Sequence, residues 1–245
     1  MAAILILGAT SPICRKLALR FALEGAKLFL AARDLDEIER VAADIRVRSG
    51  AQVFAGTFDA CDFSSHAGLI SAATEKLGRL EGLVLGVGAL GNERLAKREV
   101  SEAISVINAN YSGAVSILTL AAAELESAKH GFIIVIGSVA GDRGRQGNYV
   151  YGSAKGGLAL FAQGLRAKLA KSSVHVLTVK PGYVDTRMTW GRPGVFLCAD
   201  PDKVAARIHR ALGRRKDVIY VPSFWRPIMM VVRAIPERAF KRLSL

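Results

Sequence analysis

Short apolar segments alternate with longer amphipathic segments along almost all of this 245-residue chain. The apolar segments, which predict strands, are residues 3–7, 27–31, 52–56, 83–87, 132–136, 174–179 and 218–221. The amphipathic segments, which predict helices, are residues 12–24, 35–48, 66–77, 101–127, 149–171 and 201–212. A strand that is apolar throughout is buried on both faces, as happens in parallel sheets. The chain is therefore expected to belong to the α/β class.

The regular alternation predicts one parallel sheet with helices on both faces. Because strand–helix–strand crossovers are right-handed, the simplest topology is the doubly wound Rossmann-type fold, with the strand order 3-2-1-4-5-6-7. No linker rich in Pro, Gly or Ser divides the chain, and chains of this length often form one α/β domain. We expect a single dinucleotide-binding domain with the catalytic site over residues 1–223. A basic amphipathic C-terminal tail is expected over residues 224–245.

The charge balance and the cysteines narrow the class of partner. The formal net charge is +13, which favours partners that carry phosphate or other anionic groups. No basic motif with interleaved aromatic residues and no helix-turn-helix pattern accompanies this charge, so a nucleic-acid partner is not expected. The three scattered cysteines suit a cytoplasmic protein with reduced thiols, with neither a disulfide framework nor the spacing of a metal site. The apolar N-terminal run is too short for a signal peptide or a membrane span.

The turn between the first predicted strand and the first predicted helix is a candidate phosphate-binding loop. Gly8 ends the strand, and Thr10, Ser11, Pro12 and Ile13 lead into the helix. Backbone N–H groups at a helix N-terminus in this position accept the pyrophosphate of a dinucleotide. Pro12 has no N–H to offer, although proline is well tolerated at the first position of a helix.

The end of the second predicted strand bears on the choice of cofactor. A carboxylate there would bind the 2′-hydroxyl of the ribose and favour NAD(H). Ala32 stands at that place and Arg33 follows it. A guanidinium pairs well with a 2′-phosphate, so NADP(H) is favoured over NAD(H).

Tyr151 and Lys155 form the strongest candidate for a catalytic pair. They lie four residues apart on a predicted helix and therefore share a face. A phenol with its ordinary pKa near 10 transfers a proton poorly at neutral pH, and a neighbouring ammonium lowers that pKa. The pair thus predicts general acid–base chemistry.

Further segments stand at matching places along the chain. Ser138 follows a buried strand upstream of Tyr151, and Asn110 lies on the long predicted helix. A segment containing Pro181, Gly182, Val184 and Thr186 follows the sixth predicted strand. In order and spacing, from Gly8 to Thr186, these motifs resemble those of the short-chain dehydrogenase/reductase family.

The resemblance implies a role for each of these residues. In the catalytic set, Ser138 would orient a substrate carbonyl, Tyr151 would exchange a proton, Lys155 would tune Tyr151, and Asn110 would hold a proton-relay water. The cofactor would lie along the first turn and Arg33, with Asp59 beside the adenine and Gly88 supporting it through the backbone. Tyr151 and Lys155 would also contact the cofactor, with Lys155 bonding to the nicotinamide ribose. The nicotinamide would be closed in by Pro181, Gly182, Val184 and Thr186.

Two departures from the family pattern stand out. Of the three glycines of the family's Gly-x-x-x-Gly-x-Gly turn, only Gly8 is present, because Pro12 and Cys14 occupy the other two places. The fourth strand leads into residues 85–88, which read Leu-Gly-Val-Gly where most relatives have Asn-Asn-Ala-Gly. These changes leave open a member of the fold that binds the cofactor without turnover.

Several stretches resemble one group within the family more closely, the decaprenylphosphoryl-2-keto-erythro-pentose reductases of arabinofuranose biosynthesis. They are residues 90–91, 110–111, 140–143, 148–153, 184–188, 229–236 and 240–243. The resemblance implies that the C2 ketone of a polyprenyl-phosphoryl 2-keto-pentose is reduced. It also implies a flavin oxidase partner that makes this ketone, and a homo-oligomer assembled through the helices of Asn110 and Tyr151. A general 3-oxoacyl or small-ketone reductase remains the alternative.

The tail also has a direct physical interpretation. Apolar residues that include Trp225, Ile228 and Met229 alternate with basic residues such as Arg226 and Arg233. This composition suits a membrane interface or a polyprenyl chain with an anionic phosphate, and the protein would then sit peripherally on the inner face of the membrane. It equally suits a helix that packs on the domain or on a second subunit. The tail is too short and too charged to span a bilayer.

Overall fold

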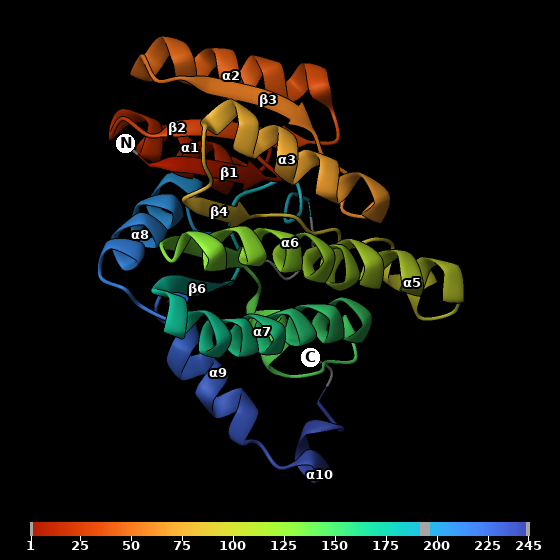
Figure 1. Cartoon of the computed structure of the whole chain (residues 1–245). Coiled ribbons are helices and arrows are strands. Elements are labelled where there is room, and N and C mark those ends of the chain that lie inside the picture. Colours follow the sequence, from red (N-terminus) through yellow and green to blue (C-terminus); the bar gives the residue numbers. More distant parts are fainter. Residues whose placement is uncertain (1, 192–196, 244–245) are drawn as a thin grey trace.

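A seven-stranded parallel sheet runs through the middle of the molecule (Figure 1). The computed structural model describes residues 2–191 and 197–243. The strands are β1 (Ala3–Leu7), β2 (Lys27–Ala32), β3 (Val53–Thr57), β4 (Gly82–Leu85), β5 (Gly131–Ile136), β6 (Val174–Pro181) and β7 (Val218–Val221). Their order in the sheet is β3-β2-β1-β4-β5-β6-β7, and every neighbouring pair is parallel. The predicted doubly wound fold and strand order are confirmed.

Helices cover both faces of this sheet (Figure 1). The helices are α1 (Pro12–Leu23), α2 (Leu35–Ser49), α3 (His66–Leu77), α4 (Glu93–Ala96), α5 (Val100–Ile107), α6 (Gly113–Ala128), α7 (Tyr149–Leu169), α8 (Pro201–Gly213), α9 (Trp225–Ala234) and α10 (Glu237–Phe240). Buried side chains of α1, α2 and α8 pack with one face of the strands, and those of α3, α6 and α7 pack with the other. The two cores follow from the strand sequences, since alternate apolar residues point to opposite faces.

The predicted helix over residues 101–127 is interrupted in the structure. A single π-helical turn, Asn108–Ser112, separates α5 from α6. Such turns are usually found at functional sites, and this one carries Asn110. Hydrophobic periodicity does not distinguish a π turn from an α turn over five residues, which is why the sequence predicts one continuous helix.

The helical stretch Val100–Ala128 is long and apolar enough by composition to cross a membrane. In the structure, however, its second part is a core helix. Ile117, Leu118, Ala121 and Leu125 of α6 are fully buried in the apolar cluster that joins this helix to the sheet. Its hydropathy is therefore explained by packing on the sheet.

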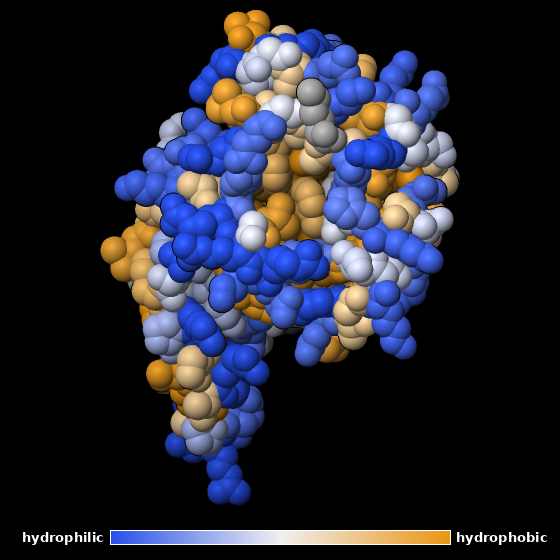
Figure 2. Space-filling model, turned by 60° about the vertical axis from the view of Figure 1, so that its left-hand side comes forward, coloured by the Kyte–Doolittle hydropathy of each residue, from blue (hydrophilic) through white to orange (hydrophobic). Residues whose placement is uncertain are grey.

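The C-terminal tail forms α9 and α10, which extend from one end of the body (Figures 1 and 2). Trp225 and Met229 of α9 are buried in a cluster with Val139, which lies just after β5. Arg143 donates hydrogen bonds to the carbonyl of Arg233 at 3.1 Å and to the carboxylate of Glu237 at 2.7 Å. Its guanidinium also lies 4.2 Å from the ring centroid of Phe240. The inner side of the tail is thus packed on the domain, while its outer side is exposed.

Candidate active site

The predicted site residues gather at the carboxyl ends of the strands, where open α/β sheets bind their ligands. Gly8 follows β1, Arg33 follows β2, Gly88 follows β4, and Ser138 follows β5. Gly182 follows β6, and Tyr151 and Lys155 lie in the first two turns of α7. The fold therefore brings residues from five loops and one helix to the same edge of the sheet.

The turn after β1 leads tightly into α1. Gly8 has φ of +74°, and a Cβ at this position would lie 2.8 Å from the carbonyl oxygen of Gly86, so no other residue fits. Thr10 lies in the turn, Ser11 is the N-cap, and Pro12 is the first helical residue. The Ser11 side chain makes no capping hydrogen bond to α1. The first N–H groups of the helix, beginning with Ile13, are thus left to an anion, as a pyrophosphate requires.

Cys14 and Gly86 explain how the turn tolerates the loss of a family glycine. The Cys14 side chain is completely buried, and a Cβ at Gly86 would overlap its sulfur. The thiol therefore occupies the volume that a side chain at position 86 would need. Burial raises the pKa of the Cys14 thiol to about 12, so the thiol is a packing group and not a nucleophile.

Charged residues lie just beyond the ends of β2 and β3. Arg33 and Asp59 are exposed at the ends of β2 and β3, and both act electrostatically on Cys61. The backbone carbonyl of Asp59 lies 3.0 Å from Nε2 of the buried His66, which fixes the loop after β3. Cys61 is exposed, and partial desolvation raises the pKa of its thiol. Asp59 adds to that rise and Arg33 opposes it.

A second pair of cations flanks the same region. Glu37 of α2 forms ion pairs with Arg15 of α1 and, at 3.5 Å, with Arg187 of the loop after β6. Neither arginine is apparent as a site residue from the sequence, because their shared partner lies in a third element. Because the two guanidinium groups share one carboxylate, this cluster keeps a net positive charge near the start of α2, the helix that follows Arg33.

Lys155 is held beneath the loop that follows β4. Its side chain is 2% exposed, and its Nζ donates a hydrogen bond of 3.0 Å to the carbonyl of Val87. A Cβ at Gly88 would lie 2.9 Å from Nζ and 3.0 Å from Oδ1 of Asn110, so the glycine lets both side chains approach. Burial lowers the pKa of Lys155 to about 8. Nζ is 5.8 Å from the ring centroid of Tyr151, which places the pair on one face of α7.

Asn110 fastens the π turn to the same loop. Its Nδ2 donates hydrogen bonds to the carbonyls of Ala89 at 2.6 Å and Val106 at 2.8 Å, and its Oδ1 accepts one from the N–H of Ala89 at 3.2 Å. Asn110 is fully buried. The structure thus places it beside Lys155, while its side chain bonds to the protein backbone.

Ser138 and Tyr151 are brought together by their neighbours in the chain. Ser138 is the N-cap of a short 3₁₀ turn, Val139–Asp142, and its Oγ accepts a hydrogen bond of 3.1 Å from the N–H of Ala140. Ala140 packs in a small cluster with Tyr151 and Val106. Ser138 is half-buried and Tyr151 is 7% exposed, so the tyrosine is largely shielded from water.

The segment after β6 is fixed by β7 and by the tail. Pro181 ends β6, and Gly182 donates a backbone hydrogen bond of 3.0 Å to the carbonyl of Val221. A Cβ at Gly182 would overlap the indole of Trp225, so α9 lies directly against this segment. Val184 is buried and pairs with Ala199 across an isolated bridge, and Thr186 begins the turn that follows. The sequence does not reveal this contact, because it joins two segments separated by β7 and α8.

Comparison with known proteins agrees with this geometry. The family model described as "short chain dehydrogenase" matches residues 2–193. An uncharacterized oxidoreductase of Mycobacterium tuberculosis is 37% identical over 242 residues, covering 99% of this chain and 97% of its own length. The NADP-dependent 3-hydroxy acid dehydrogenase of Schizosaccharomyces pombe is 28% identical over 229 residues, covering 88% of each.

Among solved structures, a short-chain dehydrogenase from Sphingobium yanoikuyae in complex with NADPH has a TM-score of 0.83. It is 25% identical, and the match covers 97% of each chain. The sheet order, the site at its carboxyl edge and these matches lead to one conclusion. The chain belongs to the short-chain dehydrogenase family.

Proposed function

We propose that the protein reduces a ketone to an alcohol with NADPH. The observation that carries the proposal is the buried pair Tyr151 and Lys155, placed at the carboxyl edge of the sheet beside Ser138. When bound there, a reduced nicotinamide would supply hydride to the carbonyl carbon. The chain's own groups would handle the proton and hold the carbonyl oxygen.

Each side chain would have its own task in this reaction. Tyr151 would donate its phenolic proton to the carbonyl oxygen, and the Ser138 hydroxyl would orient that oxygen by a hydrogen bond. Lys155, with its ammonium held near the phenol ring, would favour the phenolate that remains. Asn110 would hold the loop at Ala89, which keeps the Val87 carbonyl aimed at Lys155.

The cofactor fits the first turn and its neighbours. Gly8, Thr10, Ser11 and Ile13 offer a tight turn and a helix N-terminus to the pyrophosphate, with Pro12 as a non-donating member. Arg33, supported by Arg15 and Arg187, would pair with a 2′-phosphate, and Asp59 would lie beside the adenine. Gly88, Pro181, Gly182, Val184 and Thr186 would border the nicotinamide. The NADPH complex and the NADP-dependent relative support NADPH, with NADH as the weaker cofactor.

Replacing the phenol tests the proposal. Tyr151→Phe should lower kcat for ketone reduction by at least about a thousandfold and leave the Kd for NADPH, measured by nicotinamide fluorescence, within about twofold. Full turnover by this variant would contradict the assignment. Tight NADPH binding without turnover of any ketone by the wild-type protein would instead indicate a cofactor-sensing member of the family.

For the substrate, we propose the C2 ketone of a polyprenyl-phosphoryl 2-keto-pentose, a step of arabinofuranose biosynthesis that follows a flavin oxidase partner. The basic and apolar tail supports this, because α9 lies against Gly182 and exposes Ile228, Met230 and Val231. Figure 2 shows hydrophobic and hydrophilic side chains next to one another on the protruding tail. The protein would be cytoplasmic and peripheral, with this side of α9 at the inner face of the membrane.

A small-molecule substrate is the second candidate, favoured by the relative that acts on 3-hydroxy acids. The exposed side of α9 separates the two. Met230→Glu with Val231→Glu should lower kcat/KM for a polyprenyl-phosphoryl ketose at least about tenfold and leave that for small ketones unchanged. Val47→Glu on α2, where the valine is 87% exposed, is the control. Turnover of small ketones alone would favour the second candidate.

We also propose a homo-oligomer that assembles through α5, α6 and α7. Val100 and Ile104 of α5 are 78% and 48% exposed, and Leu160 of α7 is 69% exposed. Exposed apolar side chains on α5 and α7 suit contact with a second copy.

A further inference from the structure

A second pocket lies between α7, the 3₁₀ turn after Ser138, the last two strands and α9. Its volume is about 390 Å³, within the range of small-molecule sites. None of the candidate catalytic or cofactor residues lines it. Its lining residues include Asp142, Lys180 and Tyr220, which are termed the floor, and Arg166, Gln163 and Arg233, which are termed the walls.

The floor of this pocket is internally neutralised. Lys180 forms an ion pair with the carboxylate of Asp142, whose side chain is 2% exposed. The Tyr220 hydroxyl donates a hydrogen bond of 2.7 Å to the same carboxylate. Burial raises the pKa of Tyr220 to about 12, with Asp142 adding to the rise and Arg233 opposing it. Asp142 is thus satisfied by its own partners and does not neutralise the arginines of the walls.

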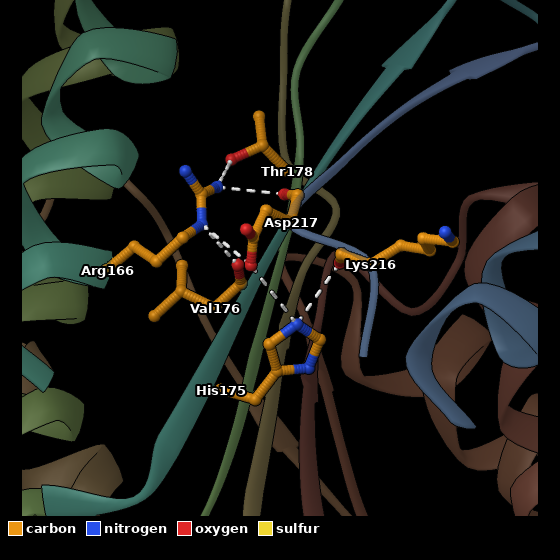
Figure 3. A network of polar contacts seen from close by, with 6 residues as sticks. All are labelled: Arg166, His175, Val176, Thr178, Lys216 and Asp217. Carbon is orange, nitrogen blue, oxygen red and sulfur yellow. Dashed lines mark hydrogen bonds and ion pairs between the residues drawn. The ribbon is translucent and has the colours of Figure 1, made fainter. Parts of the chain in front are cut away.

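Arg166 is a fixed cation in the wall. Its Nε donates to the carbonyl of Val176 at 2.8 Å, and its Nη2 donates to Oγ1 of Thr178 at 2.7 Å and to the carbonyl of Asp217 at 2.9 Å (Figure 3). The Asp217 carboxylate lies 3.7 Å from Nε and is 65% exposed, so it screens the guanidinium only from the outside. The third nitrogen, Nη1, makes no hydrogen bond to any residue that the structure describes.

The charges therefore leave the pocket positive. Among the described residues, the cations at the pocket are Arg166, Lys180 and Arg233. The carboxylates are Asp142 in the pocket and Asp217 outside it. The Gln163 amide adds a neutral donor to the wall. Several donors around one small volume match a ligand with several acceptor oxygens on one centre, and the two N–H groups of Arg166 Nη1 are charged donors for such a ligand.

We propose that this pocket binds the phosphate group of a phosphate ester. A phosphate group has more acceptor oxygens than a single carboxylate and can therefore use more of the donors that line the pocket. The phosphate could belong to a soluble ester or to a lipid headgroup, since Leu160 and Val218 give the pocket an exposed apolar rim. The site is separate from the one proposed for the dinucleotide.

The test uses the full chain saturated with NADPH, so that the phosphate sites of the cofactor are filled. Titration calorimetry with inorganic phosphate, and then with glycerol phosphate, should show saturable binding. Arg233→Gln removes one cation from an exposed residue, and Gln163→Glu places a carboxylate in the wall on an exposed helical position. Each should weaken binding at least about tenfold. Matched controls are Arg226→Gln on α9 and Ala167→Glu on α7, both exposed and outside the pocket.

A second arm replaces the soluble probes with vesicles of phosphatidylcholine and phosphatidic acid. Vesicle binding that Gln163→Glu weakens and inorganic phosphate displaces would assign the phosphate to a lipid headgroup. Binding of the soluble probes without competition from vesicles would assign it to a soluble ester. The absence of saturable binding by any probe, or equal binding by Gln163→Glu and Ala167→Glu, overturns the proposal whether or not the protein reduces ketones.

Discussion

The ammonium group of Lys155 is buried away from water, and this burial lowers the free energy of unfolding. Its pKa is about 8 in the folded protein and 10.5 in the unfolded chain. Between these values the unfolded chain binds more protons, so stability rises with pH; below pH 8 the full penalty of the buried charge remains. The free energy of unfolding of the wild type, relative to Lys155→Met, should increase by about 3 kcal/mol between pH 8 and 10.5.

Urea unfolding of the cofactor-free protein across this pH range measures the difference. Lys171→Met, which removes an exposed lysine in the 3₁₀ turn after α7, is the control, and its free energy of unfolding should change with pH as that of the wild type does. A constant difference between the wild type and Lys155→Met from pH 8 to 10.5 would mean that Lys155 keeps its ordinary pKa.

Substitutions at Cys14 and Gly86 should have coupled effects on the free energy of unfolding. Gly86→Ala puts a methyl group into the volume of the buried sulfur and should destabilise the protein by about 1–3 kcal/mol. Cys14→Gly alone weakens α1 by about 1 kcal/mol or more, through lost helix propensity and lost packing. The double variant should be more stable than the sum of the single losses predicts, because the methyl group then fills the space of the thiol. Urea unfolding gives all four free energies, and simple additivity would refute the coupling.

Helix α9 is the element whose place the sequence leaves open. Its amphipathic pattern fits a membrane surface, a second subunit or the domain itself, because periodicity reports a buried side without its partner. The structure buries Trp225 and Met229 against Val139 and leaves Met230 and Val231 exposed. The π turn at Asn110 and the short α4 also escape sequence reasoning, since four or five residues carry too little periodicity.

Removing the indole should loosen the tail. Trp225→Ala deletes the side chain that packs on Gly182 and should let α9 detach at lower temperature than the body unfolds. Trypsin should then cleave after Arg233 at least about tenfold faster than in the wild type. Ile228→Ala, at a half-exposed position on the same helix, should leave the cleavage rate near that of the wild type. Equal cleavage of the two variants would show that the indole does not anchor the tail.

Of all features of this protein, the topology of the whole chain was the easiest to predict from the sequence. Seven apolar strands in a βα alternation have few ways to form one sheet, so the strand order and the position of Gly8, Ser138 and Gly182 at its carboxyl edge follow from general rules. Contacts between distant segments, such as Glu37 with Arg187, do not follow, because each depends on the path of a loop.

A single charge introduced on the exposed side of α5 tests the proposed homo-oligomer. Ile104→Lys should reduce the molar mass measured by light scattering toward that of the 26.2 kDa chain, because a buried ammonium at a contact between copies is not compensated. Val47→Lys on α2 should leave the mass unchanged. An identical oligomer for Ile104→Lys would move the contact away from α5.

The volume shared by Cys14 and residue 86 also restricts the order in which this sequence could have arisen. Cysteine could enter position 14 without a clash only in a chain that already had glycine at position 86. An ancestor with glycine at both positions is therefore the accessible intermediate. If cysteine entered position 14 first, its sulfur would clash with the side chain at position 86. The unusual phosphate turn would then be the later of two linked substitutions, and a reconstructed lineage should show glycine at position 86 before cysteine at position 14.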